Sequence, residues 1–316
     1  MFTKENIRDF FRNLQDTICS QLEKEDGKGR FSEDKWQRKE GGGGRSRILQ
    51  NGEVIEKGGV NFSEVYGVTP EFLKKELSVN VSDNSRFFAT GISIVIHPAS
   101  PMVPIVHTNL RYLQLETFHP SGGHPKSENH KPETIEWFGG GIDLTPHYIN
   151  ADDARFFHRS LKDVCDTFNK SYYPKFKKWA DDYFFIPHRN ETRGIGGIFF
   201  DKLQADKHHS FSQRFDFVKA VGNSFIPIYS HLIRKNKNKK YSEKQKKWQL
   251  LRRGRYVEFN LVYDKGTRFG LETNGRTESI LMSLPATASW LYDYKTEKGS
   301  EEEKTQKLLK KGIEWI

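Results

Sequence analysis

Apolar residues near the N-terminus of the chain recur at every third or fourth position. They are Ile7, Phe10, Phe11, Leu14, Ile18 and Leu22. An α-helix turns once in about 3.6 residues, so this spacing places all of these side chains on one face. The sequence therefore predicts an amphipathic helix in this part of the chain.

Further segments show the shorter period of β-strands. Residues 46–57 (SRILQNGEVIEK) predict a hairpin, because the Asn-Gly pair in their middle favours a two-residue turn. Residues 87–97 are rich in β-branched side chains, residues 105–117 alternate between apolar and polar, and residues 135–144 carry a glycine triplet. A short apolar run at 194–201 predicts one more strand.

Two connecting segments carry helix-start and turn signals. Thr69-Pro70 precedes a short predicted helix at 72–77, with proline at the first helical position. Residues 119–131 are rich in Pro, Ser, Gly and His, and this composition predicts a loop or an insertion.

The second half of the chain is mostly helical in pattern. Predicted helices cover residues 152–168, 173–185, 211–233 and 242–251, and strand-like runs follow at 256–263, 269–272 and 279–283. Strands thus occur in neighbouring runs and do not alternate with helices. The expected class is α+β, with a large antiparallel β-sheet flanked by α-helices on both faces. No convincing linker divides the chain, so we expect residues 1–316 to form a single domain.

Charge narrows the choice of partner only coarsely. The chain has 51 Lys and Arg against 41 Asp and Glu, a net charge of +10 at neutral pH. This charge suits an anionic partner, which is a nucleic acid, an acidic membrane surface or an acidic metabolite. Much of the excess lies in residues 235–247, in a pattern typical of a solvated face. No nucleic-acid-binding motif occurs, so we expect no nucleic acid partner.

Cysteine usage and the N-terminal segment indicate a compartment. Cys19 and Cys165 are too few for a disulfide framework or a zinc site, and they predict buried thiols in a reducing compartment. Residues 1–21 contain acidic side chains and no long apolar run, unlike a signal peptide or a membrane span. We therefore expect a cytoplasmic enzyme with no transmembrane segment.

The first motif with chemical potential is GGGGRSR at residues 41–47. Its glycines allow a close approach of backbone to a ligand, and Arg45 and Arg47 could bind carboxylates or phosphate. The alternative is a flexible loop with two surface arginines. The motif lacks the Lys-Ser/Thr ending of a phosphate-binding P-loop, which argues against nucleotide binding.

A second group is His97, His107 and Arg111. The two histidines end and begin successive predicted strands, so their imidazoles could come close if those strands pair. Arg111 lies four residues after His107 and therefore faces the same side of a strand. On a bound anion, His107 could act as an acid and Arg111 as an anchor. The alternative is that the histidines are structural.

The third motif is WFGGGIDLTP at residues 137–146. Asp143 follows three glycines, where a strand could press its backbone against a flat ligand. Asp143 could accept hydrogen bonds from pyrrole-type N–H groups, or act as a base if burial raised its pKa. It could equally be a turn or helix-cap residue.

Further histidines and arginines follow along the chain. His188, Arg189 and Arg193 precede a glycine-rich strand, and His158 lies in a predicted helix. Four separated histidines (His97, His107, His158 and His188) could form a metal site, although their spacing matches no tight ligand signature. Asn274, Gly275 and Arg276 form a turn that offers N–H groups and a guanidinium to a carboxylate, or an ordinary hairpin turn.

Taken together, these motifs resemble the oxygen-dependent coproporphyrinogen-III oxidases. The matching strings run in order along almost the whole chain: GGGGRSR (41–47), GVNFSEVYG (59–67), ATGISIVIHP (89–98), VPIVHTNLR (103–111), WFGGGIDLTP (137–146), YPKFKKWADDYFFIPHRNETRGIGGIFFD (173–201), RRGRYVEFNLVYDKGTRFGL (252–271) and TESILMSLP (277–285). The resemblance implies oxidative decarboxylation of two propionates of coproporphyrinogen III to vinyl groups, giving protoporphyrinogen IX. It also implies dioxygen as co-substrate, release of carbon dioxide and hydrogen peroxide, no organic cofactor, and a homodimer with its interface near Tyr256–Leu291.

The resemblance also implies roles for individual residues. His107 falls on the proposed proton donor, and Asp143 on a residue proposed to hold the pyrrole nitrogens. Implied substrate-binding residues are Ser93, Asn109, Leu110, Arg111, Arg189, Arg193, Asn274, Gly275 and Arg276. Implied ligands of a divalent metal, as proposed for some bacterial members, are His97, His107, His158 and His188.

Two features depart from the family pattern. Asn274 stands where some members have glycine, and asparagine can also adopt a positive φ. The segment 119–133 is longer than in many bacterial members. Its histidines could be ligands, but we expect a solvated insertion.

Overall fold

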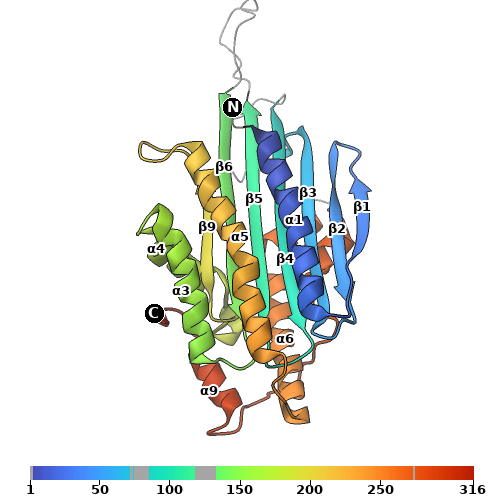
Figure 1. Cartoon of the computed structure of the whole chain (residues 1–316), viewed down its shortest axis with the longest axis vertical. Coiled ribbons are helices and arrows are strands. Elements are labelled where there is room, and N and C mark those ends of the chain that lie inside the picture. Colours follow the sequence, from blue (N-terminus) through green and yellow to red (C-terminus); the bar gives the residue numbers. More distant parts are fainter. Residues whose placement is uncertain (1–2, 72–73, 75–84, 118–132, 273–274) are drawn as a thin grey trace, which may run out of the picture.

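The computed structural model describes residues 3–71, 74, 85–117, 133–272 and 275–316. Its centre is one antiparallel sheet, with strand order β1-β2-β3-β4-β5-β6-β9. These strands are β1 (Ser32–Gln37), β2 (Gly42–Gln50), β3 (Ile55–Val68), β4 (Arg86–Pro98), β5 (Ile105–Thr117), β6 (Glu133–Thr145) and β9 (Gly197–Leu203). Helices lie in front of the sheet and behind it (Figure 1). The predicted α+β class with helices on both faces is confirmed.

The turn between β2 and β3 forms where the Asn-Gly pair predicted it. Asn51 has a φ of 58°, in the left-handed region that asparagine tolerates well. The N–H of Asn51 donates to the Glu56 carbonyl, and that of Gly52 donates to the Ile55 carbonyl. The Asp26 carboxylate accepts N–H bonds from Val54 and Ile55, which ties the turn to the end of the first helix.

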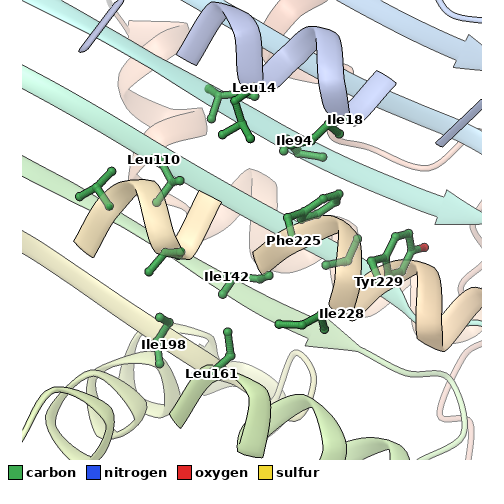
Figure 2. Packing of buried hydrophobic residues seen from close by; sticks show 14 of the residues in the cluster. Leu14, Ile18, Ile94, Leu110, Ile142, Leu161, Ile198, Phe225, Ile228 and Tyr229 are labelled. Atoms are coloured by element: carbon green, nitrogen blue, oxygen red, sulfur yellow. The ribbon is translucent and has the colours of Figure 1, made fainter. Parts of the chain in front are cut away.

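The main hydrophobic core lies between one face of the sheet and a layer of helices. These helices are α1 (Lys4–Asp26), α3 (Ala151–Phe168), α4 (Tyr172–Tyr183) and α5 (Phe211–Asn236). Ile94, Leu110 and Ile142 point from the strands toward α1 and α5, where they meet Leu14 and Phe225 (Figure 2). Since side chains alternate along a strand, the intervening residues point to the opposite face.

The opposite face of the sheet is covered by α6 (Glu243–Val262). Tyr256 of this helix packs on Val95 and Ile105 in a small separate core. Arg253 reaches the sheet through Glu56, at 2.7 Å. The remaining helices are α7 (Lys265–Glu272), α8 (Thr277–Leu281) and α9 (Glu301–Leu308). On this face of the sheet, polar and charged strand residues therefore meet the C-terminal helices.

The three strands predicted after residue 251 are wrong. Residues 256–263 continue α6 and end just after it, and residues 269–272 and 279–281 belong to α7 and α8. The string YVEFNLVY alternates, but Tyr256 and Phe259 also fit the helical period and are both buried. Packing of that helical face decides the outcome over local β-propensity. The short helix predicted at 72–77 and the loop at 119–131 lie almost entirely outside the described residues.

Cys19 and Cys165 are both buried and form no disulfide, as predicted. Burial raises the pKa of each thiol to about 12. In the described part of the chain, no helix is both long and apolar enough to cross a bilayer.

Candidate active site

The face of the sheet opposite the main core carries two rows of small and polar residues on β3 to β6. Strand register aligns Asn61, Ser93, Asn109 and Gly141 in one row and Ser63, Gly91, Arg111 and Gly139 in the next. We call these residues the polar floor. Its β3 side is covered by α8, because Asn61 donates to the Ser279 carbonyl at 2.9 Å. Its β5 side is more open, where the Arg111 side chain is 39% exposed.

His107 and Asp143 lie beside this floor and directly opposite each other on β5 and β6. The Nδ1 atom of His107 is 2.7 Å from Oδ1 of Asp143. The His107 side chain is 19% exposed and that of Asp143 only 1%. Among the described residues, Nε2 of His107 has no hydrogen-bond partner. A buried carboxylate thus orients an imidazole whose other nitrogen can meet a ligand.

Arg193 completes this group from the segment before β9. Its Nη2 donates to both oxygens of Asp143, at 2.8 and 2.7 Å, and its Nη1 donates to Asn260 of α6 at 2.8 Å. The guanidinium also lies within 5 Å of three aromatic rings, those of Phe184, Tyr256 and Phe259. Such cation–π contacts favour a charged arginine in an otherwise apolar site. Arg193 is 2% exposed, and among the described residues its hydrogen bonds go to Asp143 and Asn260.

Electrostatics fix Asp143 as a carboxylate. Burial alone would raise its pKa, but the charge of Arg193 and the hydrogen bond with His107 outweigh burial and lower the pKa. The condition under which Asp143 could act as a base, a pKa raised by burial, is therefore not met in this structure. Both of its oxygens accept hydrogen bonds from His107 or Arg193, and its side chain is 1% exposed. Asp143 therefore orients the His107 ring.

A glycine backbone lets β9 approach Asp143 this closely. Gly197 lies opposite Asp143, and a Cβ at Gly197 would come within 2.0 Å of the Ile142 carbonyl oxygen. Any side chain there would push β9 away from β6. The GIGG sequence therefore supports the site geometrically.

Arg111 is held at the other end of the floor by Asp201 of β9. Its Nη2 is 2.9 Å from Oδ1 of Asp201, and its Nη1 donates to Asn109 at 3.2 Å. The sequence indicated Asp201 only as the last residue of a predicted strand. Its spacing could have shown more, because Asp201 lies four residues after Gly197 and therefore shares that face of β9.

Not all predicted ligand-binding residues reach this face. The Leu110 side chain is fully buried in the main core (Figure 2). Because side chains alternate along β5, Leu110 lies on the face of the sheet opposite His107. Arg45 and Arg47 also point to the α1 side, where both contact Asp16, at 2.9 and 2.7 Å. Strand alternation is the physical reason, because each of these residues is flanked by neighbours that face the floor side.

Arg276 lies toward the β1 side of the sheet, and Gly275 lies beside α7. Arg276 forms an ion pair with Asp34 of β1, and the N–H of Gly275 donates to the Gly270 carbonyl at 2.8 Å. Asn274 lies outside the described residues. The structure therefore gives Arg276 a protein carboxylate as its partner.

Two of the four histidines considered as metal ligands are buried and separately bonded. Nε2 of His97 is 2.8 Å from the Ser283 carbonyl, and burial lowers the pKa of His97 to about 3. His158 lies between Tyr173 and the Ile195 carbonyl, at 3.0 Å from each, and burial lowers its pKa to about 4. Both imidazoles are thus neutral and have hydrogen-bond partners in the core.

The third, His188, lies in the short segment Pro187–Arg189 and binds α6. Its Nε2 is 2.7 Å from Glu258, and Arg189 donates to the same carboxylate through two nitrogens at 2.8 Å. In the part of the chain that the structure describes, no three His, Cys, Asp or Glu side chains gather as a metal site. The four histidines therefore do not form one ligand set, and Arg189 does not reach the floor.

Glu258 gives a testable pH dependence. Burial would raise its pKa, but hydrogen bonds from Arg189 and His188 lower it from 4.5 to about 2. Its contribution to stability is complete above pH 4.5 and is lost as pH falls toward 2. The difference in melting temperature between wild type and Glu258→Gln should be constant above pH 4.5 and shrink below it. Glu301→Gln, at an exposed ion pair, is the control; a pH-independent difference for Glu258→Gln contradicts this assignment.

The fold and site define a class of protein: an α+β protein in which linked His, Asp and Arg side chains lie beside a polar face of the sheet. Comparison with known proteins narrows this class to one family. The family model described as coproporphyrinogen III oxidase matches residues 6–315. The chain belongs to this family.

Curated relatives agree with the family assignment. The chain is 49% identical over 309 residues to the "Oxygen-dependent coproporphyrinogen-III oxidase, chloroplastic" of Glycine max, covering 96% of this chain and 77% of that protein. It is 47% identical over 324 residues to the "Oxygen-dependent coproporphyrinogen-III oxidase" of Drosophila melanogaster, covering 99% and 79%. It is 47% identical over 309 residues to "Coproporphyrinogen-III oxidase 1, chloroplastic" of Arabidopsis thaliana, covering 96% and 77%.

Proposed function

We propose that this chain, acting as one domain over residues 1–316, is an oxygen-dependent coproporphyrinogen-III oxidase. It converts two propionates of coproporphyrinogen III to vinyl groups and yields protoporphyrinogen IX. The observation that carries this proposal is near-full-length identity of 47–49% to relatives of that name. The His107–Asp143–Arg193 group beside a polar floor supplies the matching chemistry.

The reaction balances without an organic cofactor, and we propose that none takes part. Each propionic acid side chain loses carbon dioxide, and its β-carbon loses a hydrogen, so that a carbon–carbon double bond forms. One dioxygen accepts the two electrons and two protons and leaves as hydrogen peroxide. The protein must therefore bind carboxylates, exclude side reactions and move protons.

His107 is the group we assign to proton transfer. The Asp143 carboxylate accepts the Nδ1–H bond, which leaves Nε2 to give or take a proton at the floor. Arg193 keeps Asp143 ionised, and the ionised Asp143 accepts the hydrogen bond that orients the His107 ring. Asp143 and Arg193 therefore act through His107.

Arg111, Asn109 and Ser93 are the residues we assign to substrate binding on the floor. Arg111 offers a partly exposed guanidinium, and a guanidinium can bind a carboxylate with two parallel hydrogen bonds. Asn109 and Ser93 lie next to each other in register and offer polar groups that are only partly buried. Four propionates on the substrate explain the need for a cationic anchor here.

The proposed activity is tested by incubating the purified chain with coproporphyrinogen III in air and under argon. Protoporphyrin is measured by fluorescence after chemical oxidation of the products. The proposal predicts product in air, with about one dioxygen consumed per vinyl group, and none under argon. Equal product under both gases, or none in air, would refute it.

We further propose that the chain forms a homodimer through the surface near Tyr256–Leu291. Several large apolar side chains in and near that range are strongly exposed: Leu261, Val262, Leu271, Trp290, Leu291 and Tyr292. Removing this surface from water on association would stabilise a dimer.

The dimer is tested by light scattering on a variant that carries both Leu261→Asp and Leu291→Asp. Wild type should have twice the mass of the chain, and the variant should be monomeric, because two buried charges oppose association. Val68→Asp is the control, since Val68 is 62% exposed and lies on β3. A monomeric wild type would contradict the proposal.

We also propose a cytoplasmic location. Its support is the pair of buried thiols, which form no disulfide and suit a reducing compartment. Cell fractionation with an antibody against the chain tests it, and recovery from an organelle fraction would contradict it.

A further inference from the structure

Asp201 is a second carboxylate beside the polar floor, and its surroundings differ from those of Asp143. Asp143 is 1% exposed, and both its oxygens are bonded. The Asp201 side chain is 31% exposed, although its Oδ1 is buried beside Arg111. The exposed part of the carboxyl group is therefore Oδ2, which has no hydrogen-bond partner among the described residues. Asp201 can accept from a ligand where Asp143 cannot.

The sheet is built to hold Asp201 and Arg111 together. The pair spans from β5 to β9 directly above Gly139 of β6, which lies opposite Arg111 in register. A Cβ at Gly139 would come within 2.4 Å of Oδ1 of Asp201 and 2.8 Å of Nη2 of Arg111. Gly139, the first residue of the GGG triplet in the sequence, thus leaves room for this pair.

We propose that Asp201 is a substrate-binding residue whose Oδ2 accepts a hydrogen bond from a pyrrole N–H, while its Oδ1 holds Arg111 for a propionate of the same molecule. This inference rests on the proposed function. A tetrapyrrole carries both N–H donors and carboxylates, so an acceptor next to a guanidinium matches both groups. A carboxylate makes stronger hydrogen bonds than a neutral acceptor.

The charge balance of the pair supports this arrangement. An isolated carboxylate at this place would repel the substrate's propionates, but Arg111 neutralises Asp201 at 2.9 Å. A partly exposed ion pair contributes little to folding stability, so its partners can adjust to a ligand at small cost. The pair therefore favours ligands with both N–H donors and carboxylates over simple carboxylates.

The test is a double-mutant cycle of Asp201→Asn and Arg111→Lys, read as the Kd of coproporphyrin III from fluorescence quenching. Lysine keeps the positive charge that neutralises Asp201 and removes the guanidinium. Coproporphyrin III is an oxidised macrocycle that is stable in air and keeps ring N–H donors and all propionates, so binding is measured without turnover. Asp201→Asn should weaken binding about tenfold in the native background and again in the Arg111→Lys background. If the loss of affinity persists in the Arg111→Lys background, the Asp201 contact does not depend on the Arg111 guanidinium.

Asp182→Asn is the matched control, because Asp182 forms exposed ion pairs away from the floor with Lys178 and Lys311. Its Kd should stay within about twofold of wild type. Asp201→Ser is the second variant if Asp201→Asn melts at a lower temperature. An unchanged Kd for Asp201→Asn, or a loss seen only when Arg111 is present, overturns the inference. Absence of oxygen-dependent turnover by wild type is a separate result that refutes the proposed function itself.

Discussion

Replacing His107 with alanine is expected to lower kcat about 10²–10⁴-fold, the range that a positioned acid–base group contributes. The His107 side chain is 19% exposed and is held by one hydrogen bond to Asp143, so its removal should leave the fold intact. Loss of turnover with little change in KM would place its action in the chemical step. Steady-state rates with coproporphyrinogen III in air measure this.

His208→Ala provides the control for this prediction, since His208 is an exposed histidine in the loop before α5. Its rate should equal that of wild type. Circular dichroism and melting temperature establish that His107→Ala is folded. If His107→Ala retains most of the wild-type kcat, proton transfer does not depend on this imidazole.

Replacing Asp143 with asparagine is expected to destabilise the protein by about 3–5 kcal/mol, because the buried Arg193 loses the carboxylate that neutralises it. Arg193 and Asp143 are both almost fully buried, at 2% and 1% exposure, and are joined at 2.7 Å. The same change removes the carboxylate that orients the His107 ring, so turnover should also fall. Urea unfolding measures the first effect, and kcat the second.

The effect of the two charges on stability can be separated from the effect of side-chain packing. A variant with both Asp143→Leu and Arg193→Met removes both charges and should recover much of the lost stability. It should not recover turnover, since His107 still lacks its partner. Equal stability of Asp143→Asn and wild type would show that the Asp143–Arg193 pair is not needed to keep a charge in the core.

The pH dependence of stability provides a further check on Asp143. Its pKa is lowered in the folded protein, so its contribution is present above its ordinary value of 3.8 and is lost as pH falls below that value. The stability gap between wild type and Asp143→Asn should therefore close in acid.

Much of the sheet could be predicted from sequence because each strand carries its own local signal. Residues 105–117 were predicted as a strand, and β5 covers the same residues. Alternation along that strand correctly placed His107 and Arg111 on one face. The same rule, applied to its neighbours, would have put Leu110 in the core.

The parts that failed depend on contacts between distant segments. Asp143 meets His107 across a register that no local pattern defines, and Arg193 arrives from a turn fifty residues further on. The pKa of Asp143 could not be predicted without Arg193, since burial and charge shift this pKa in opposite directions. The four histidines in these motifs suggested a common metal site. The strands and helices that carry them direct each side chain to a different partner.

The most direct test of the account is the rate of protoporphyrinogen formation in air by wild type and His107→Ala, measured side by side. The account predicts oxygen-dependent turnover by wild type and a rate lower by about two orders of magnitude or more for a folded His107→Ala. Comparable rates for the two proteins, or no turnover by wild type, would contradict it.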